Sequence, residues 1–456
     1  MSVYALSREI FTYLKNIAIY LYKCPIYLDI VNTNEATLIA AQAAKVFQPR
    51  TPITTKELFA GRWNELTTAA DAVSQTGLHV VIYGERGVGK TSLSNVVRPT
   101  IWALDNVDKQ EHEETIERLI VKTNASIGDD FSAIWDKLFG DITWQDNRAA
   151  VGIVPTPKGK MSIREAFGIG NDCKFSVDNV RRVLSNIPGA VFIVDEFDRA
   201  VKETSQTFTD LIKVLSDLGV DCTIILVGVA ETVDRLIADH ASVSRALIQI
   251  LVPRMGSDDL KQILKNAEKK LSVKFAPEAA GFIVHVSQGL PHYTHLLGLH
   301  AVRSAVLARA STTIDRTDVF KALKEAVRQA QQSVSDKHSK ATHSSHKEAL
   351  YRQVLLACAL TAARSHDAWG YFAPSDVVDH LNTILDRDDV QIATFTNHLS
   401  EFCQEKRGEV LEKEGQARAY RFRFTDPLLV PYVFMDAVAT GLVSDTQLTR
   451  LLGEPV

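Results

Sequence analysis

The sequence predicts an α/β fold built on a parallel sheet, followed by a helical domain and a C-terminal domain of different pattern. Between residues 51 and 253, apolar strands alternate with amphipathic helices, an order typical of a parallel sheet. A glycine-rich loop follows one of these strands, and two acids follow another. After residue 253 the strand patterns stop and helical patterns continue.

The strands are expected at residues 78–83, 116–124, 190–194, 222–228 and 247–252. They are continuous apolar runs because both faces of a parallel sheet are covered by helices. Helices are expected at residues 63–75, 130–139, 177–186, 208–218 and 232–240. In the second of these, Phe131, Ile134, Trp135 and Leu138 repeat on one face. Residues 140–172 are rich in Gly, Pro and polar residues and predict a long loop or hairpin.

The composition is that of an ordinary globular chain. The 456 residues are 46% hydrophobic and 23% charged, and the net charge of −4 does not indicate a protein that coats nucleic acid. No apolar stretch is long enough to span a membrane, and the five cysteines lack metal-ligand spacing. We therefore expect a cytoplasmic protein without a membrane partner.

The most specific motif is G-x-x-x-x-G-K-T, which runs from residue 84 to residue 91 between a strand and a helix. Its glycines let the backbone curl so that N–H groups point at phosphate oxygens, and the helix start adds partial positive charge. Lys90 is expected to reach the β- and γ-phosphates, and the Thr91 hydroxyl to ligate Mg²⁺. The predicted nucleotide-binding residues of this loop are Gly84, Glu85, Arg86, Gly87, Val88, Gly89, Lys90, Thr91 and Ser92.

The strand at residues 190–194 ends in Asp195 and Glu196. The carboxyl ends of parallel strands open onto the ligand crevice of α/β folds. We expect Asp195 beside Thr91 in the Mg²⁺ shell, and Glu196 to orient and deprotonate the attacking water. Together with the loop, these acids predict an ATPase that uses ATP and Mg²⁺.

Flanking segments complete the predicted domain organisation. Residues 1–50 form a helical arm, which either packs on the main domain or meets a partner protein or neighbouring subunit. Residues 51–253 form the α/β nucleotide-binding domain, and 254–331 a helical lid domain. Residues 332–346 are polar without apolar period and predict a linker. Residues 347–456 place three helices before a hairpin around Gly415, the order of a winged helix, with a C-terminal extension.

Taken together, the motifs resemble AAA+ ATPases of the branch that contains origin-recognition initiators, transposon regulators and STAND-like ATPases. The resemblance covers about residues 51–435. It is carried by LFAGR at 58–62, the loop at 84–91, VDE at 194–196, SR at 244–245, GLP at 289–291 and the terminal winged-helix order.

The resemblance implies further site residues. Arg245, just before the fifth strand, is implied to be an arginine finger that enters the site of a neighbouring subunit, with Arg254 as second candidate. Arg62 is implied to border the adenine. His292 follows GLP where relatives often carry a sensor arginine, and it can contact phosphate when protonated.

The position of the first sensor residue stays open in the sequence. In relatives a polar residue follows the fourth strand, and no Asn stands there in this chain. Glu231 and Thr232 are the alternatives.

Two functions fit these features. The first is an ATP-dependent switch, active as a homo-oligomer, that remodels, loads or activates a macromolecular partner, with DNA as one possible partner. The second is a slowly hydrolysing STAND-like signalling ATPase, for example in antiviral defence, whose winged helix contacts protein. Residues 347–456 hold 11 Lys and Arg against 16 Asp and Glu, yet the hairpin carries Lys413, Arg418, Arg421 and Arg423. These basic side chains form either a wing on DNA or a solvated face.

Overall fold

The computed structural model describes residues 25–106, 118–145, 160–230, 233–237, 243–345, 349–364, 370–416 and 419–453. Contacts divide the chain into two compact units. The nucleotide unit is Arg50–Asp259 with Gly289–Pro291, and the helical unit is Met1–Pro49, Leu260–Gln288 and His292–Val456. Within the described ranges, every helix is too short or too polar to cross a membrane.

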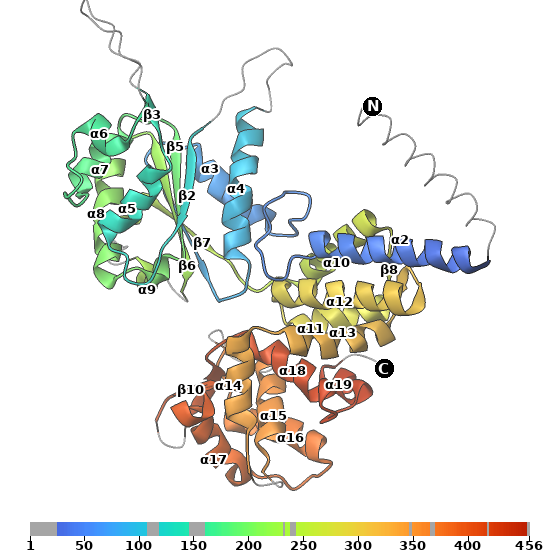
Figure 1. Cartoon of the computed structure of the whole chain (residues 1–456). Helices are drawn as coiled ribbons and strands as arrows, with labels where there is room; N and C mark the ends of the chain where they lie inside the picture. The colour runs from blue at the N-terminus through green and yellow to red at the C-terminus, as the bar shows by residue number, and fades with distance from the viewer. Residues whose placement is uncertain are drawn as a thin grey trace, which may run out of the picture. The chain divides into compact units, whose positions relative to one another are not determined.

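The nucleotide unit is built on a five-stranded parallel sheet, which confirms the predicted fold class (Figure 1). The strand order is β2-β5-β6-β1-β7, so β2 and β7 form the edges. The strands are β1 (His79–Gly84), β2 (Ile120–Asn124), β5 (Ala190–Asp195), β6 (Cys222–Val229) and β7 (Leu247–Leu251). Since all pairings are parallel, the carboxyl ends of β1, β5 and β6 meet at one edge of the sheet.

Helices cover both faces of this sheet (Figure 1). On one side lie α3 (Trp63–Val73) and α4 (Lys90–Asp105), and on the other α5 (Phe131–Gly140), α7 (Val177–Leu184) and α8 (Lys202–Asp217). The core of the second side is aromatic: the Trp135 ring lies 4.9 Å from Phe139, 5.4 Å from Phe192 and 6.1 Å from Phe208. The predicted helix face of α5 is therefore the one that packs on the sheet.

Short elements complete the nucleotide unit. They are the hairpin β3 (Trp144–Gln145) and β4 (Lys160–Met161), α6 (Ile163–Phe167), the 3₁₀ turn Phe197–Arg199 and α9 (Val233–Leu236). The hairpin and α6 lie in the segment that we expected to be a loop or hairpin insertion.

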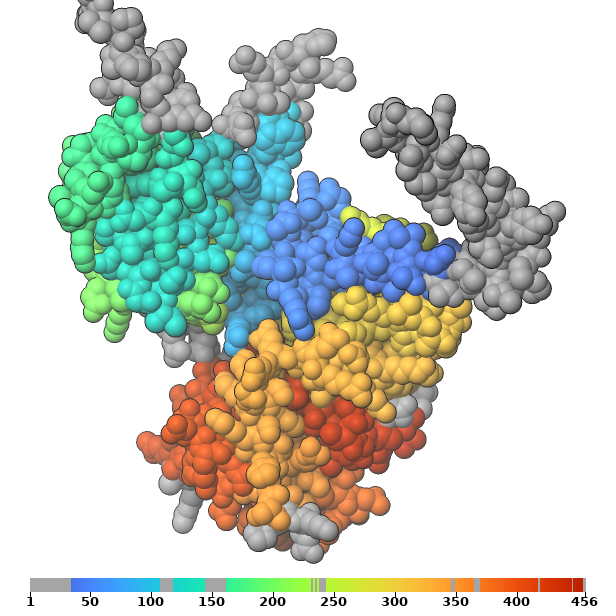
Figure 2. Space-filling view, in the orientation of Figure 1, coloured from blue at the N-terminus to red at the C-terminus, as the bar shows by residue number. Residues whose placement is uncertain are grey.

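The helical unit contains α2 (Pro25–Val46), most of α10 (Ser257–Leu271) and α12 (Pro291–Arg309), and α11 (Pro277–Ser287) and α13 (Arg316–Gln329). Strands β8 (Lys274–Phe275) and β9 (Thr313–Ile314) pair between them. The end of α2 packs on this group, since the Phe47 ring lies 6.5 Å from Phe275 and 6.0 Å from His295. In Figure 2 the blue segment of α2 lies against the yellow helices of the same unit.

The rest of the helical unit has the predicted order of three helices and a hairpin. The elements are α15 (Tyr351–Arg364), α16 (Pro374–Leu385), α17 (Ile392–Phe402), β10 (Leu411–Glu414) and β11 (Arg421–Phe424). Phe372 adds a bridge to Phe422 at the edge of the hairpin. The apolar helix α18 (Leu429–Ala439), nearly all of it buried, packs against α13 and α15, and α19 (Asp445–Leu451) follows it. The winged-helix assignment stays a prediction.

The linker prediction for residues 332–346 is wrong over most of its length, because helix α14 (Gln332–Thr342) lies there. Val334, His338 and Ala341 form its buried face, at the spacing of an amphipathic helix. His338 is one third of that face, and burial lowers the pKa of its imidazole. Because histidine counts as a polar residue in a sequence, the apolar repeat of this helix could not be recognised.

Candidate nucleotide-binding site

The loop between β1 and α4 has the curled backbone that the motif predicts. Gly84, Gly87 and Gly89 have φ values of 150°, 84° and 99°, and Gly89 caps the start of α4. A Cβ atom at Gly84 would lie 2.4 Å from the backbone oxygen of Val252, so only glycine fits there. Val88 is buried beneath the loop and anchors it. The N–H groups at the start of α4 are thus available to an anion at the loop.

Lys90 is buried inside this loop. Its Nζ atom donates to the backbone oxygens of Gly84 at 3.0 Å and Glu85 at 2.7 Å. Burial lowers the pKa of Lys90 to about 8, and the nearby carboxylates of Asp198 and Asp195 oppose this effect. An anion at the loop would favour the charged form of this lysine.

The other predicted loop residues lie around this centre. Thr91 and Ser92 are half-buried in the first turn of α4, and the Ser92 hydroxyl accepts from the Ile53 amide at 3.1 Å. Glu85 and Arg86 are exposed. The Glu85 carboxylate pairs with Arg254 at 2.7 Å, so the second-choice finger contacts the loop of its own chain.

Asp195 lies at the end of β5 and is only 2% exposed. Its Oδ1 atom accepts from the Glu196 amide at 2.9 Å, and its Oδ2 atom lies 2.9 Å from the Nζ atom of Lys122. The contact with Lys122 is an ion pair, since no donor is aimed at Oδ2 with hydrogen-bond geometry. The buried carboxylate is therefore already paired with a cation from β2.

Glu196 has a left-handed backbone with φ 54°, which costs free energy for a side chain of this type. Its Oε2 atom lies 3.2 Å from Nη1 of Arg199. Two residues later, the Asp198 carboxylate accepts from the Val229 amide at 2.7 Å, at the end of β6. Backbone strain of this kind is common at functional sites.

Sequence reasoning missed the roles of Lys122 and Asp198. Lys122 is the one basic residue of strand β2. A basic residue in a strand of the predicted sheet could have drawn attention to this position. Asp198 stands three residues after Asp195, but its contact with Val229 depends on the neighbouring strand. Both residues join the site through long-range packing rather than local pattern.

Arg62 is buried at the start of α3. Its Nη2 atom donates to the Pro253 oxygen at 2.6 Å, and burial lowers the pKa of its guanidinium, with Glu65 and Asp259 opposing. It lines a cavity of about 340 Å³ with Gly61, Trp63, Asn64, Glu65, Pro253, Arg254, Met255 and Asp259. Among the described residues, its Nε and Nη1 atoms have no hydrogen-bond partner. Its predicted place beside adenine stays a prediction.

Arg245 and His292 each have a partner outside residues 84–92. Arg245 precedes β7, is 78% exposed on its side chain and pairs with Asp217. His292 belongs to the helical unit, where its Nδ1 atom hydrogen bonds to the Pro49 oxygen. Glu231 and Thr232 lie outside the described residues.

The residues present fit a nucleotide with Mg²⁺. Among the described residues, no three His, Cys, Asp or Glu side chains cluster closely enough to hold a metal ion by themselves. Mg²⁺ in such proteins is held by one or two protein groups together with phosphate oxygens, which matches the single buried carboxylate of Asp195 and the hydroxyl of Thr91. The curled loop supplies the phosphate cradle.

Three solved structures are among those to which this chain is similar. Among solved structures, the chain is similar to a Walker-type ATPase of Pyrococcus abyssi, with 15% identity, a TM-score of 0.46 and coverage of 85% of this chain and 99% of that one. It is also similar to the Aeropyrum pernix ORC2 protein in ADPNP–ADP complexes, with 14% identity, a TM-score of 0.46 and coverage of 90% and 97%. The Aeropyrum pernix ORC1 protein in complex with DNA matches with 14% identity, a TM-score of 0.42 and coverage of 87% and 97%.

The comparison with curated proteins finds no significant match. The sequence model of the family described as Novel STAND NTPase 1, or nSTAND1, matches residues 50–369. This match spans more than half of the chain, includes the loop and the two acids, and agrees with the resemblance to STAND-like ATPases inferred from the motifs. The chain therefore belongs to the Novel STAND NTPase 1 family.

Proposed function

We propose that this protein is an ATP-dependent switch of the STAND type, which binds ATP with Mg²⁺, hydrolyses it slowly and activates a macromolecular partner as an oligomer. One arrangement supports the proposal in this member of a STAND NTPase family: the loop with Lys90 follows β1, Asp195 and Glu196 stand at the end of β5, and the charge of Asp195 acts on Lys90.

The proposed division of labour follows from the positions of the side chains. Lys90 and the N–H groups of the loop bind the phosphates, and Thr91 and Asp195 hold Mg²⁺, which when bound draws negative charge from the phosphate oxygens. Glu196 orients the attacking water and accepts its proton at a carboxylate oxygen. Arg245 is available to a neighbouring subunit because its guanidinium is exposed.

Slow hydrolysis is supported by the two ion pairs that hold the acids. Asp195 is paired with Lys122, and Glu196 with Arg199. The buried Asp195 must leave Lys122, or share it, before it acts on the metal, whereas the exposed pair of Glu196 costs little to break. A site that needs this rearrangement suits a switch that rests in one state, rather than an enzyme of fast turnover.

The hairpin supports a protein partner over DNA. Arg423 pairs with Glu412 and lies 4.7 Å from the Tyr371 ring, while the Lys413 ammonium lies 4.4 Å from the Tyr420 ring. These two cations are engaged within the hairpin region and are less available to phosphate groups, while Arg421 is exposed and Arg418 lies outside the described residues.

The test uses the purified full chain. Fluorescent analogues of ATP and GTP are titrated with Mg²⁺, and the size of the protein is measured by light scattering with and without ADPNP. We expect binding that prefers ATP, a Lys90→Ala variant with at least roughly tenfold weaker binding, and a larger assembly with ADPNP. The Lys213→Met variant, which changes an exposed lysine of α8, is the matched control.

Equal binding by the wild type and Lys90→Ala would contradict the nucleotide site. Binding without any change in size would contradict the oligomeric switch. Salt-dependent binding of duplex DNA by the wild type would favour the DNA-loading alternative over a protein partner.

A further inference from the structure

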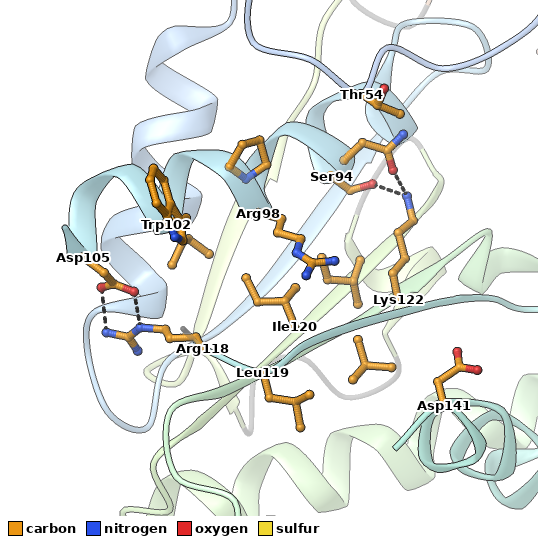
Figure 3. Close-up of a pocket in the computed structure, with 15 residues that line it drawn as sticks. Thr54, Ser94, Arg98, Trp102, Asp105, Arg118, Leu119, Ile120, Lys122 and Asp141 are labelled. Carbon is orange, nitrogen blue, oxygen red and sulfur yellow. Dashed lines mark hydrogen bonds and ion pairs between the residues drawn. The ribbon is translucent and has the colours of Figure 1, made fainter. Parts of the chain in front are cut away.

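Lys122 connects the edge strand β2 with helix α4 and with Asp195. Figure 3 shows its side chain extending from β2 to the start of α4. The Nζ atom lies 2.8 Å from Ser94 Oγ, 2.6 Å from Asn95 Oδ1 and 2.9 Å from Asp195 Oδ2. The ammonium thus donates two hydrogen bonds to α4 and forms an ion pair with Asp195.

Among the residues that the structure describes, Lys122 is the cation that pairs with the buried carboxylate of Asp195. A carboxylate that is removed from water needs a counter-charge or several donors, and Asp195 receives one hydrogen bond, from the Glu196 amide. Lys90 contributes charge at longer range, but its Nζ atom donates to Gly84 and Glu85. Lys122 is thus the direct partner of Asp195 Oδ2.

We propose that Lys122 is the resident counter-cation of Asp195 and competes with Mg²⁺ for its carboxylate, so that it sets how much Mg²⁺ nucleotide binding requires. The proposal rests on the proposed function, in which Asp195 and Thr91 hold Mg²⁺. A metal ion at the same carboxylate would stand a few ångströms from the ammonium, and the like charges would repel each other strongly where water is scarce.

The structure also provides a place for the ammonium when Asp195 turns to the metal. Ser94 and Asn95 stay as acceptors on α4, and the Ser94 hydroxyl donates to the Thr91 oxygen at 2.9 Å. Lys122 therefore contacts the carboxylate of Asp195 directly, and its Ser94 partner is bonded to the backbone oxygen of Thr91 in the same turn of α4.

Lys122 and its partners Ser94 and Asn95 line a solvent-accessible cavity. It has a volume of about 800 Å³, runs between α4 and the edge strand β2, and includes Lys122, Thr54, Arg98 and Trp102 in its lining (Figure 3). The Lys122 side chain is 24% exposed. Water in this cavity can hydrate the ammonium as it leaves Asp195, which lowers the free-energy cost of the exchange.

The test compares the Mg²⁺ dependence of nucleotide binding in the full-length wild type, Lys122→Met and Lys122→Gln. The probe is a fluorescent, non-hydrolysable ATP analogue, and Mg²⁺ is titrated at fixed nucleotide. We expect the Mg²⁺ concentration at half-saturation to fall by roughly fivefold or more in both variants, because a nearby like charge is removed. Lys122→Gln keeps an N–H donor without the charge, so the two variants separate the loss of charge from the loss of a donor. Lys213→Met is the control and should follow the wild type.

A second readout needs no nucleotide. Without metal, Lys122→Met should unfold at a lower temperature than the wild type, since Asp195 is then buried without its cation. In the Asp195→Asn background, the same Lys122→Met change should have a much smaller effect on the unfolding temperature. An unchanged or raised Mg²⁺ requirement in both Lys122 variants would overturn the proposal while leaving the nucleotide site intact. A wild type that binds no nucleotide, or binds it without regard to Mg²⁺, would overturn the proposed function itself before any variant is compared.

Discussion

Replacing Glu196 by Gln should abolish turnover and leave both folding and nucleotide binding nearly unchanged. The substitution keeps the size of the side chain and removes its charge. The lost ion pair joins Glu196 and Arg199 at 3.2 Å, with side chains 42% and 51% exposed, and an exposed pair of this kind contributes at most about 1 kcal/mol. The hydrogen bond to Asp195 is donated by the backbone of residue 196 and remains. Loss of a general base costs roughly 10²–10⁴-fold in rate, which is about 3–5 kcal/mol in the barrier.

The assay measures phosphate release at saturating ATP and Mg²⁺, beside the dissociation constant of a fluorescent ATP analogue. Arg199→Gln is the matched control, since it breaks the same ion pair and leaves the carboxylate; it should hydrolyse ATP at least as fast as the wild type. Turnover of Glu196→Gln close to that of the wild type would refute the assignment of the base. Equal losses in both variants would show that the ion pair, and not the carboxylate, matters.

Three further predictions concern the finger, the sheet and the loop. Arg245→Ala should bind nucleotide normally and lose roughly 10³-fold in its hydrolysis rate. If the arginine acts on a neighbouring subunit, mixing this variant with Glu196→Gln should restore part of the hydrolysis. No restoration would contradict that role. Burial lowers the pKa of His79 from its ordinary value of 6.5 to about 4. Between these two pH values the unfolded chain binds more protons than the folded one. The free energy of unfolding should therefore fall as the pH drops from 6.5 to 4. The loss at this site is about 3 kcal/mol. Denaturant unfolding at several pH values should show a weaker pH dependence for His79→Asn, which keeps an acceptor for the Ile224 amide; an equal dependence would disprove the link. Gly84→Ala should lower the free energy of unfolding by about 2 kcal/mol or more, because its Cβ meets the Val252 oxygen. Gly140→Ala, which meets nothing within 4 Å, is the control for the same denaturant measurement, and equal effects would refute the steric argument.

Local patterns predicted most of the elements that carry the site. The apolar run at 190–194 became β5 (Ala190–Asp195), and the run at 78–83 became β1 (His79–Gly84), because continuous apolar residues can be buried only inside a covered sheet. Helix α14 was missed for a related reason. Its buried face includes His338, whose apolar behaviour depends on the burial that lowers its pKa. A sequence does not tell whether a histidine is buried.

The sequence by itself determined that this chain has a phosphate-binding loop and two acids at the end of a buried strand, since glycine spacing and apolar runs are local features. Only the tertiary structure decided what these acids contact. Lys122 is far from Asp195 along the chain, and they meet because β2 and β5 pair in parallel, with Lys122 level with Ile193. Strand pairing is non-local, so no pattern within either strand could predict the cation that now stands beside the buried carboxylate.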